Sequence, residues 1–333
     1  MTDTGTERAR KSDRAVLTLA LGPRVYWDMA VNLARSIRRW HSAADLPIAI
    51  ATDCSLTLPG DLADVQVIRI RPKELGVGFE TKLHLDRLAP AARTLFIDAD
   101  CLVYARLDAV FSKFAGQTVG VVQERIASVG ERFGDIAAYC RYLEVPAIPV
   151  FTGGVYYLER DGATSVYEEA RRLFRHYDEL GMVRLRGLPN EEVLVAGAMA
   201  RHNLFGVPDD GTFTGDFQTS PGDHSFAILQ GRRRMSNPPA GHALHCASAP
   251  VREIAPSIVH FLAYHTHLPP YRAETAALSW AAHGIPAGLA HFFSRLFILW
   301  PGLAMIRCKN ALRPVYRRFF GFRQVPPTDR TTA

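Results

Sequence analysis

The chain has 333 residues, of which 48% are hydrophobic and 22% charged, and its formal net charge is +6. This composition is ordinary for a globular protein that buries a large core in one large domain or two smaller ones. The positive charge favours anionic partners such as nucleotide diphosphates or acidic lipids. No zinc-finger, RNA-recognition or basic-zipper pattern occurs, so we expect no nucleic-acid partner.

The cysteine pattern argues against a disulfide framework. The five cysteines are scattered, and no two of them form a Cys-x-x-Cys pair. This usage favours a reducing compartment, so we expect a cytoplasmic protein. Residues 1–14 are polar and lack an apolar signal region, which predicts a disordered tail and no secretion.

From position 15 to about 150 the chain alternates strand-like and helix-like segments. Apolar residues recur at helical spacing over 27–40, and 81–88 also has the character of a helix. Short apolar runs predict strands over 16–21, 46–52, 65–70, 95–100 and 118–123. This alternation predicts a mostly parallel sheet covered by helices, which binds ligands at the carboxyl ends of its strands.

Two aspartates, Asp98 and Asp100, follow the apolar residues of the fourth predicted strand. Side chains two positions apart on an extended chain point the same way, so the two carboxylates are expected side by side. Like charges at that distance repel each other, and a divalent cation relieves the repulsion. Oxygen ligands of this kind suit Mg²⁺ or Mn²⁺. Asp53 ends another predicted strand at the same edge.

The second half of the chain is more mixed. Residues 153–159 and 258–262 are strand-like, and the second run carries His260. A charged helix is predicted over 163–180. Asn190 has the character of an N-cap for a helix that ends near Arg201.

The segment from 284 to 322 differs from the rest. Residues 289–306 are nearly all apolar, but the uninterrupted run 296–306 is shorter than the roughly 20 residues that span a bilayer. The basic residues that follow alternate with aromatic ones. They are Arg307, Lys309, Arg313, Arg317 and Arg318 among Tyr316, Phe319, Phe320 and Phe322. Two interpretations stay open, namely a helix on an anionic membrane surface and a helical pair that packs on the preceding domain.

Six sequence blocks, in order along the chain, resemble glycogenin and its relatives in glycosyltransferase family 8. They are 71–77 (RPKELGV), 81–84 (TKLH), 96–100 (FIDAD), 107–111 (LDAVF), 151–155 (FTGGV) and 258–262 (IVHFL). The resemblance covers about 16–271. It implies the A-type nucleotide-sugar transferase fold and a sugar transfer that retains the anomeric configuration.

The resemblance also implies roles for particular residues. Asp98, Asp100 and His260 would hold Mn²⁺ (or Mg²⁺) on the donor diphosphate, and Lys82 would contact the donor. Asn190 and Glu191 would hold the donor sugar near the reacting carbon. The other expected donor-binding residues are Leu19, Ala20, Leu21, Gly22, Tyr26, Asp53, Ala99, Thr152, Gly153 and Ala263.

The sequence departs from the family pattern at three places. Thr152 stands where the family has Asn, and Asn190-Glu191 replaces Asp-Gln. The family's Gly-x-x-Lys after the histidine block is 263–266 (AYHT) here, without the lysine. Two alternatives to an enzyme therefore remain, a non-catalytic nucleotide-sugar-binding protein and a membrane-surface scaffold that acts through its C-terminal segment.

The resulting prediction is an α/β protein with one A-type glycosyltransferase domain over 15–272. A helical, basic and aromatic appendage follows over 273–325, and a disordered tail over 326–333. We expect a metal-dependent transfer of a sugar from a nucleotide-diphosphate donor, a UDP-sugar, to a hydroxyl of a glycan or lipid-linked acceptor. The expected location is the cytoplasm, with peripheral attachment to the inner face of the membrane.

Overall fold

The structure is a computed structural model that describes residues 12–247, 249 and 253–321. The tails predicted over 1–14 and 326–333 lie outside the described residues, except for positions 12–14. Of these, Arg14 already begins the first strand.

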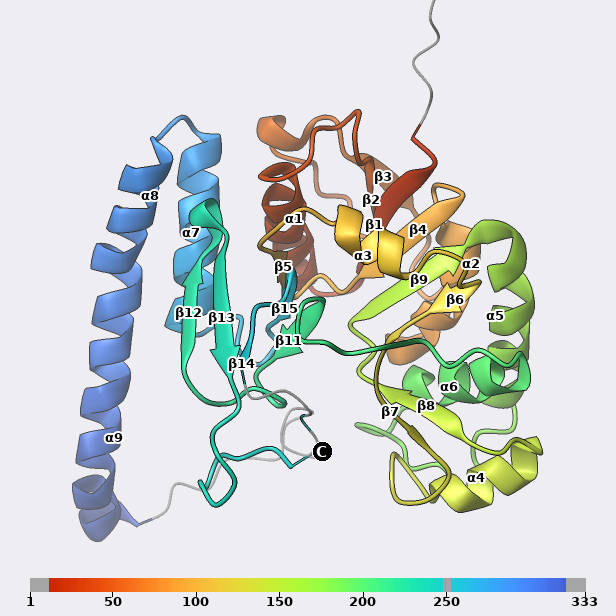
Figure 1. The fold of residues 1–333 in the computed structure, drawn as a ribbon. Coiled ribbons are helices and arrows are strands. Elements are labelled where there is room, and N and C mark those ends of the chain that lie inside the picture. Colours follow the sequence, from red (N-terminus) through yellow and green to blue (C-terminus); the bar gives the residue numbers. More distant parts are fainter. Residues whose placement is uncertain (1–11, 248, 250–252, 322–333) are drawn as a thin grey trace, which may run out of the picture.

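A six-stranded mixed sheet forms the centre of the molecule (Figure 1). Its strand order is β3-β2-β1-β4-β9-β6, and β1 to β4 all run parallel, whereas β9 is antiparallel to both of its neighbours. The strands are β1 (Arg14–Ala20), β2 (Ile48–Thr52), β3 (Gln66–Arg69), β4 (Arg93–Ile97), β6 (Val119–Gly120) and β9 (Val155–Glu159). The predicted α/β class with a mostly parallel, mixed sheet is therefore confirmed.

Helices cover both faces of this sheet, which explains why its inner strands are apolar on both sides. Helix α1 (Arg24–Arg38) packs on the face that carries Val16 and Ile50. The opposite face, which carries Leu17 and Phe96, packs on other helices. These are α4 (Ile136–Leu143), α5 (Arg160–Phe174) and α6 (Glu191–Arg201). Successive residues of β1 thus alternate between two hydrophobic cores.

Several predicted elements differ in detail from the structure. The segment 81–88 is the end of a 3₁₀ helix, η2 (Gly78–His84), followed by one turn of α-helix, α2 (Leu85–Leu88). Near their junction the Leu83 carbonyl accepts a hydrogen bond from Arg171. The strand predicted over 118–123 is broken, since β6 and β7 (Val122–Ala127) belong to different sheets. The helix predicted to reach 180 ends at Phe174, after which the backbone continues in i→i+3 turns.

Three small sheets surround the carboxyl edge of the central sheet. Their strand orders are β10-β7-β8, β11-β15-β5 and β12-β13-β14. The remaining strands are β5 (Cys101–Val103), β8 (Ile148–Phe151), β10 (Val207–Pro208), β11 (Thr214–Asp216), β12 (His224–Ala227), β13 (Arg232–Ser236), β14 (Glu253–Ile254) and β15 (Ile258–His260). The short helices are η1 (Gly60–Leu62), α3 (Asp108–Lys113) and η3 (Ile228–Gln230).

The C-terminal part is a helical pair. Helix α7 (Pro269–Ala282) packs on the domain, and the predicted domain boundary after position 272 lies inside it. After a short turn, α8 (Ala287–Ser294), a π-helical segment (Arg295–Leu299) and α9 (Trp300–Phe320) form one long helix beside α7 (Figure 1). Among the described residues this 34-residue helix alone has the length and hydropathy that would suffice to cross a membrane.

Candidate functional site

Asp98 and Asp100 lie in the turn between β4 and β5, at the carboxyl edge of the parallel strands. Strand β4 ends at Ile97, so the expected extended run to Asp100 is wrong. The chain turns instead, because the Cys101 N–H donates to the Asp98 carbonyl (3.0 Å). The Asp98 N–H donates to the Gly154 carbonyl (2.9 Å), which fixes the start of the turn. Both carboxylates are nonetheless directed toward one histidine.

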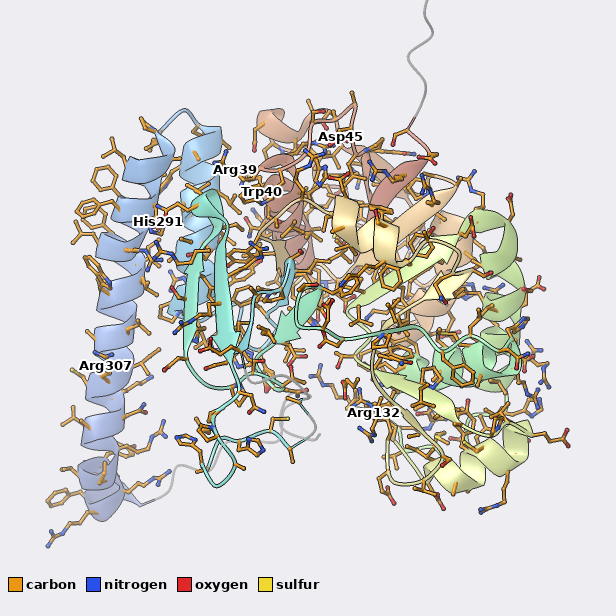
Figure 2. All side chains as sticks on the ribbon, in the orientation of Figure 1. Arg39, Trp40, Asp45, Arg132, His291 and Arg307 are labelled. Atoms are coloured by element: carbon orange, nitrogen blue, oxygen red, sulfur yellow. The ribbon has the colours of Figure 1, made fainter. Side chains whose placement is uncertain are left out.

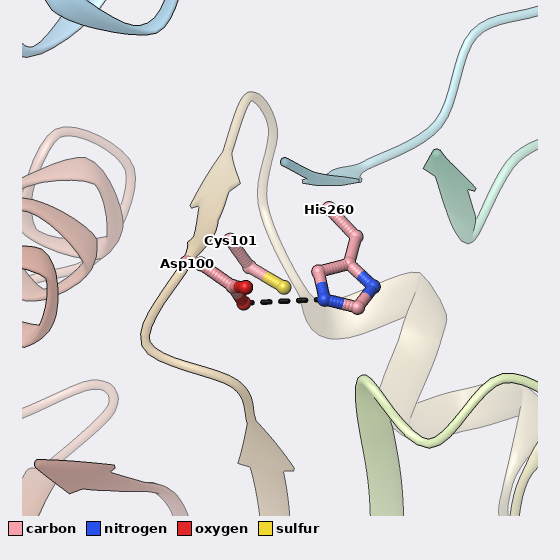
Figure 3. Close-up of side chains that lie close together, drawn as sticks. All are labelled: Asp100, Cys101 and His260. Carbon is pink, nitrogen blue, oxygen red and sulfur yellow. Dashed lines mark ion pairs between the residues drawn. The ribbon is translucent and has the colours of Figure 1, made fainter. Parts of the chain in front are cut away.

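That histidine is His260, which the pairing of β15 with β5 places opposite Cys101. Its Nε2 atom lies 3.2 Å from Asp100 Oδ1 (Figure 3). The same atom lies 4.0 Å from Asp98 Oδ2. Within the described part of the chain, Asp100 Oδ1 is buried without a hydrogen bond of regular geometry. Burial alone would lower the pKa of His260, but the neighbouring aspartates outweigh it and raise this pKa to about 9. His260 conversely lowers the pKa of Asp100, although burial opposes it.

Asp100, Cys101 and His260 bring ligand atoms within 4.8 Å of one another, and Asp98 lies nearby with its Oδ2 atom paired to Lys82. Asp98 and Asp100 offer carboxylate oxygens and His260 an imidazole nitrogen, a donor set that suits Mn²⁺ or Mg²⁺. The Cys101 thiol lies close to Asp100 and His260, as Figure 3 shows. Burial and the two aspartates raise the pKa of this thiol well above its ordinary value, so it stays protonated and is a poor ligand.

Lys82 of η2 connects this cluster to helix α6. Its ammonium group lies 2.7 Å from Asp98 Oδ2, 3.1 Å from Glu191 Oε1 and 2.8 Å from the Gly153 carbonyl. Burial would lower the pKa of Lys82, but the two carboxylates outweigh it and raise this pKa. The lysine is therefore a largely buried group, 15% exposed, that stays charged.

Asn190 and Glu191 begin helix α6, as the sequence predicts. Asn190 is the N-cap, and its side-chain oxygen accepts a hydrogen bond from the Glu192 N–H (2.7 Å). Glu191 is almost fully buried, and burial raises its pKa to about 7 despite the attraction of Lys82. Among the described residues, Glu191 Oε2 has no hydrogen-bond partner. A buried carboxylate oxygen with free capacity thus lies beside Lys82.

The turn Thr152-Gly153-Gly154 passes close to the Glu191 carboxylate and to the His260 ring. A Cβ atom on Gly153 would lie 2.7 Å from Glu191 Oε1, and one on Gly154 would lie 2.7 Å from His260 Nδ1. Only glycine fits at these two positions without displacing the neighbours. Thr152 is directed elsewhere, since its hydroxyl donates to Glu124 (3.0 Å).

The residues predicted for the base and ribose lie at the ends of β1 and β2. The Gly22 N–H donates to Asp53 Oδ1 (2.9 Å), and the Thr52 hydroxyl donates to the Ala20 carbonyl. Leu19 and Leu21 are half-buried and Tyr26 is exposed. Because β1, β2 and β4 are parallel, their carboxyl ends share the edge at which Asp98 lies.

The backbone after His260 approaches Asp100. The Ala263 N–H donates to Asp100 Oδ2, and Leu262 and Ala263 have φ values of 54° and 43°. Two successive non-glycine residues in the left-handed region are costly, and such strain concentrates at functional sites. Ala99 is buried between the two aspartates.

Arg132 and Glu192 also belong to this region. Of the two, Arg132 is not expected from the sequence. The Arg132 guanidinium donates to Glu192 Oε2 (2.8 Å) and to the Phe151 carbonyl, and Glu192 Oε1 accepts from the Gly153 N–H (2.8 Å). Glu192 therefore supports the glycine turn. Arg132 lies in a loop with no recognisable motif, so no sequence signal identifies it.

No known family profile matches this sequence, and no curated protein sequence matches it. Among solved structures, the galactosyltransferase LgtC in complex with donor and acceptor sugar analogs matches with a TM-score of 0.52 and 13% identity, over 82% of this chain and 97% of that one. An active-site glutamine-to-glutamate mutant of LgtC matches with a TM-score of 0.51 and 13% identity, over 83% and 99%. The chain thus has the fold of the A-type glycosyltransferases.

Proposed function

We propose that this protein is a metal-dependent glycosyltransferase. Its donor is a nucleotide-diphosphate sugar, a UDP-sugar, and its acceptor is a hydroxyl of a glycan or lipid-linked glycan. The observation that carries this proposal is the convergence of Asp98, Asp100 and His260 with Lys82 and Glu191 at the carboxyl edge of an A-type sheet. The donor and acceptor sugar analogs in the LgtC structure support this choice of substrates. Membership of glycosyltransferase family 8, close to glycogenin, and retention of configuration rest on the six sequence blocks.

The cation would be held by Asp98, Asp100 and His260. When bound, Mn²⁺ or Mg²⁺ supplies positive charge that offsets the negative charge developing on the leaving diphosphate. Two neighbouring backbone segments hold the ligands of this site in place. Gly154 leaves room for the His260 ring, and the Ala263 N–H holds one oxygen of Asp100.

Lys82 supplies a second positive charge, fixed before the substrate arrives. Its three partners hold the ammonium group between the aspartates and Glu191. A charge held in this way costs little reorganisation when negative charge develops nearby. We therefore assign Lys82 the role of stabilising the donor as its sugar leaves.

Glu191 is the carboxylate that we place at the donor sugar. Its free oxygen, Oε2, is buried, and its other oxygen is fixed by Lys82. A carboxylate in this state can accept hydrogen bonds from sugar hydroxyls or stabilise positive charge at the reacting carbon. Asn190 acts differently, because its oxygen caps α6 and so positions Glu191.

A panel of donors tests the proposal. Nucleotide release would be measured with UDP-, GDP- and dTDP-sugars in Mn²⁺, in Mg²⁺ and in chelator. We expect release from a UDP-sugar that requires the cation, that Asp100→Asn abolishes and that the surface control Asp178→Asn retains. Turnover in chelator, or full activity of Asp100→Asn, contradicts the metal mechanism. Donor binding without transfer or hydrolysis would instead identify a nucleotide-sugar-binding protein.

A further inference from the structure

The long C-terminal helix, residues 287–320, has one face on the domain and one face free. The inner side carries small residues. Ala290 and Ser294 are buried, and a Cβ atom on Gly302 would lie 2.5 Å from Pro269 of α7. The close approach of α7 along this side fixes which side of the helix faces outward.

The outward side is apolar along its whole length. We call it the outer face, and Figure 2 shows rings projecting from the side of α8 and α9 that is remote from α7. Its exposed side chains include Trp300, at 51%, and Phe319, at 74%. The others are Leu289, Phe292, Leu296, Phe297, Met305, Leu312 and Val315. At 1.5 Å per residue, this stripe is about 50 Å long.

Basic residues border the outer face in α9. Positions 301, 305, 308, 312, 315 and 319 are spaced by three or four residues and form the apolar line. The five cations of this segment are exposed. At about 100° per residue, Arg307, Lys309 and Arg318 flank the apolar line, whereas Arg313 and Arg317 lie on the other side of the helix. The stretch 287–320 contains no Asp or Glu.

We propose that this helix is the surface by which the protein binds an anionic lipid bilayer. It would lie along the interface with its outer face in the acyl boundary and its cations at the headgroups, on the cytoplasmic face of the inner membrane. Apolar and basic residues in this arrangement are typical of interfacial helices. The inference is independent of sugar transfer, and it adopts the membrane-surface interpretation of the two that the sequence leaves open.

The charge pattern argues against a second copy as the occupant of the outer face. Two such helices packed face to face would bring together the flanking cations of both, Arg307, Lys309 and Arg318, with no acidic group from 287–320 to offset them. Coiled-coil pairs normally place opposite charges beside the apolar seam. An anionic lipid surface complements these flanking cations.

The inner side argues against a helix that crosses the bilayer. Arg295, in the middle of the apolar stretch, is turned toward the domain, and its guanidinium donates to the Phe226 carbonyl and to His291. A crossing helix would have to leave α7 and carry this arginine into hydrocarbon. Lying along the surface keeps every contact that the structure shows.

Vesicle binding tests the proposal directly, because Trp300 reports on the outer face. Trp27 is 4% exposed, and Trp40 and Trp280 are half-buried. With vesicles of phosphatidylglycerol and phosphatidylcholine we expect flotation of the protein and a shift of tryptophan emission to shorter wavelength. The shift should be absent in Trp300→Phe. With phosphatidylcholine alone we expect little binding, and about 1 M NaCl should release the protein, since screening is then strong.

Two sets of variants separate the apolar and the charged contributions. M305S/L312S/F319S and K309E/R318E should each weaken binding to the anionic vesicles, the second on the order of 100-fold. Matched controls change exposed residues far from this helix, V129S/Y142S for the apolar set and R141E for the charged set, and should bind as the wild type does. Circular dichroism checks that every variant is folded.

Three results would overturn the proposal. The first is no flotation with anionic vesicles, or equal flotation of all variants. The second is association that resists both high salt and alkaline carbonate, which indicates a spanning helix. The third is a dimer in solution that M305S/L312S/F319S dissociates, which indicates that a second copy covers the outer face.

Discussion

The Lys82 ammonium group lies 3.1 Å from Glu191 Oε1, and solvent reaches little of either side chain. The same group lies 2.7 Å from Asp98. One buried cation therefore joins the aspartate turn after β4 to the first residue of α6.

Lys82→Met should impair both folding stability and sugar transfer. The substitution leaves Asp98 and Glu191 without their shared cation, and breaking a buried ion pair on one side lowers the free energy of unfolding by about 3 kcal/mol. Urea unfolding and nucleotide release would be measured on the same preparations. Lys113→Met removes a surface pair with Asp210 and should cost below about 1 kcal/mol. Equal effects of the two substitutions would contradict the role of Lys82.

The activity of the free enzyme should fall as pH drops through about 7. Burial raises the pKa of Glu191 to about 7, so the carboxyl group is protonated and neutral below that pH. If the ionised form faces the sugar, kcat/KM decreases about tenfold per pH unit on the acidic side. Glu191→Gln should be roughly 100-fold less active and should lack this acidic limb. If Glu191→Gln keeps the acidic limb of the pH profile, that limb belongs to a group other than Glu191.

Gly154→Ala should weaken cation binding with little effect on the rest of the fold. The added methyl group would lie 2.7 Å from His260 Nδ1 and would displace the ring from the two aspartates. Disturbing the support of a metal ligand typically costs about 10–100-fold in affinity. Mn²⁺ titration followed by electron paramagnetic resonance measures this loss. Gly60→Ala is the matched control, because a Cβ atom there meets no atom within 4 Å.

Glu274→Gln should make stability less dependent on pH. Burial raises the pKa of Glu274 to about 7 from an ordinary value of 4.5, although the Ile228 N–H, Arg295 and Arg232 lower it. The stability that this group contributes is therefore complete below about pH 4.5 and is lost as pH rises to 7. Relative to the variant, the wild type should lose on the order of 2 kcal/mol between pH 5 and pH 8. Urea unfolding at both pH values measures the difference, with the exposed Glu179→Gln as control. A parallel loss in Glu274→Gln would refute this assignment.

The sequence predicts the central sheet well, because β1, β2 and β4 are apolar runs whose burial on both faces leaves little choice of structure. It also places Asn190 at the start of α6, since an asparagine before an apolar run is a strong N-cap signal. Its errors lie at 81–88 and 118–123, where the helix is 3₁₀ and the strand divides between two sheets, and at the ends of two elements, since β4 stops at Ile97 and α5 at Phe174.

The site is predictable only in part. The aspartate pair is visible as local sequence, but the distance of 3.2 Å between Asp100 and His260 depends on the pairing of β5 with β15, which no local pattern encodes. Arg132 reaches Glu192 from a loop that carries no motif. The direction of the apolar face of α9 likewise depends on its contact with α7, so periodicity alone could not distinguish the two interpretations of the C-terminal segment.

The π-helical segment Arg295–Leu299 sets the rotational phase of the long helix. A π-bulge inserts one residue relative to an uninterrupted α-helix, which corresponds to a turn of about 100°. Without it, the line of outward side chains that starts at Leu289 and Phe292 would continue through Arg307 and Asn310. With it, the line continues through Cys308 and Leu312. Deleting one residue from this segment would therefore restore an uninterrupted α-helix and keep the two halves of the stripe in line, whereas a regular α-helix of unchanged length would turn them apart by about 100°.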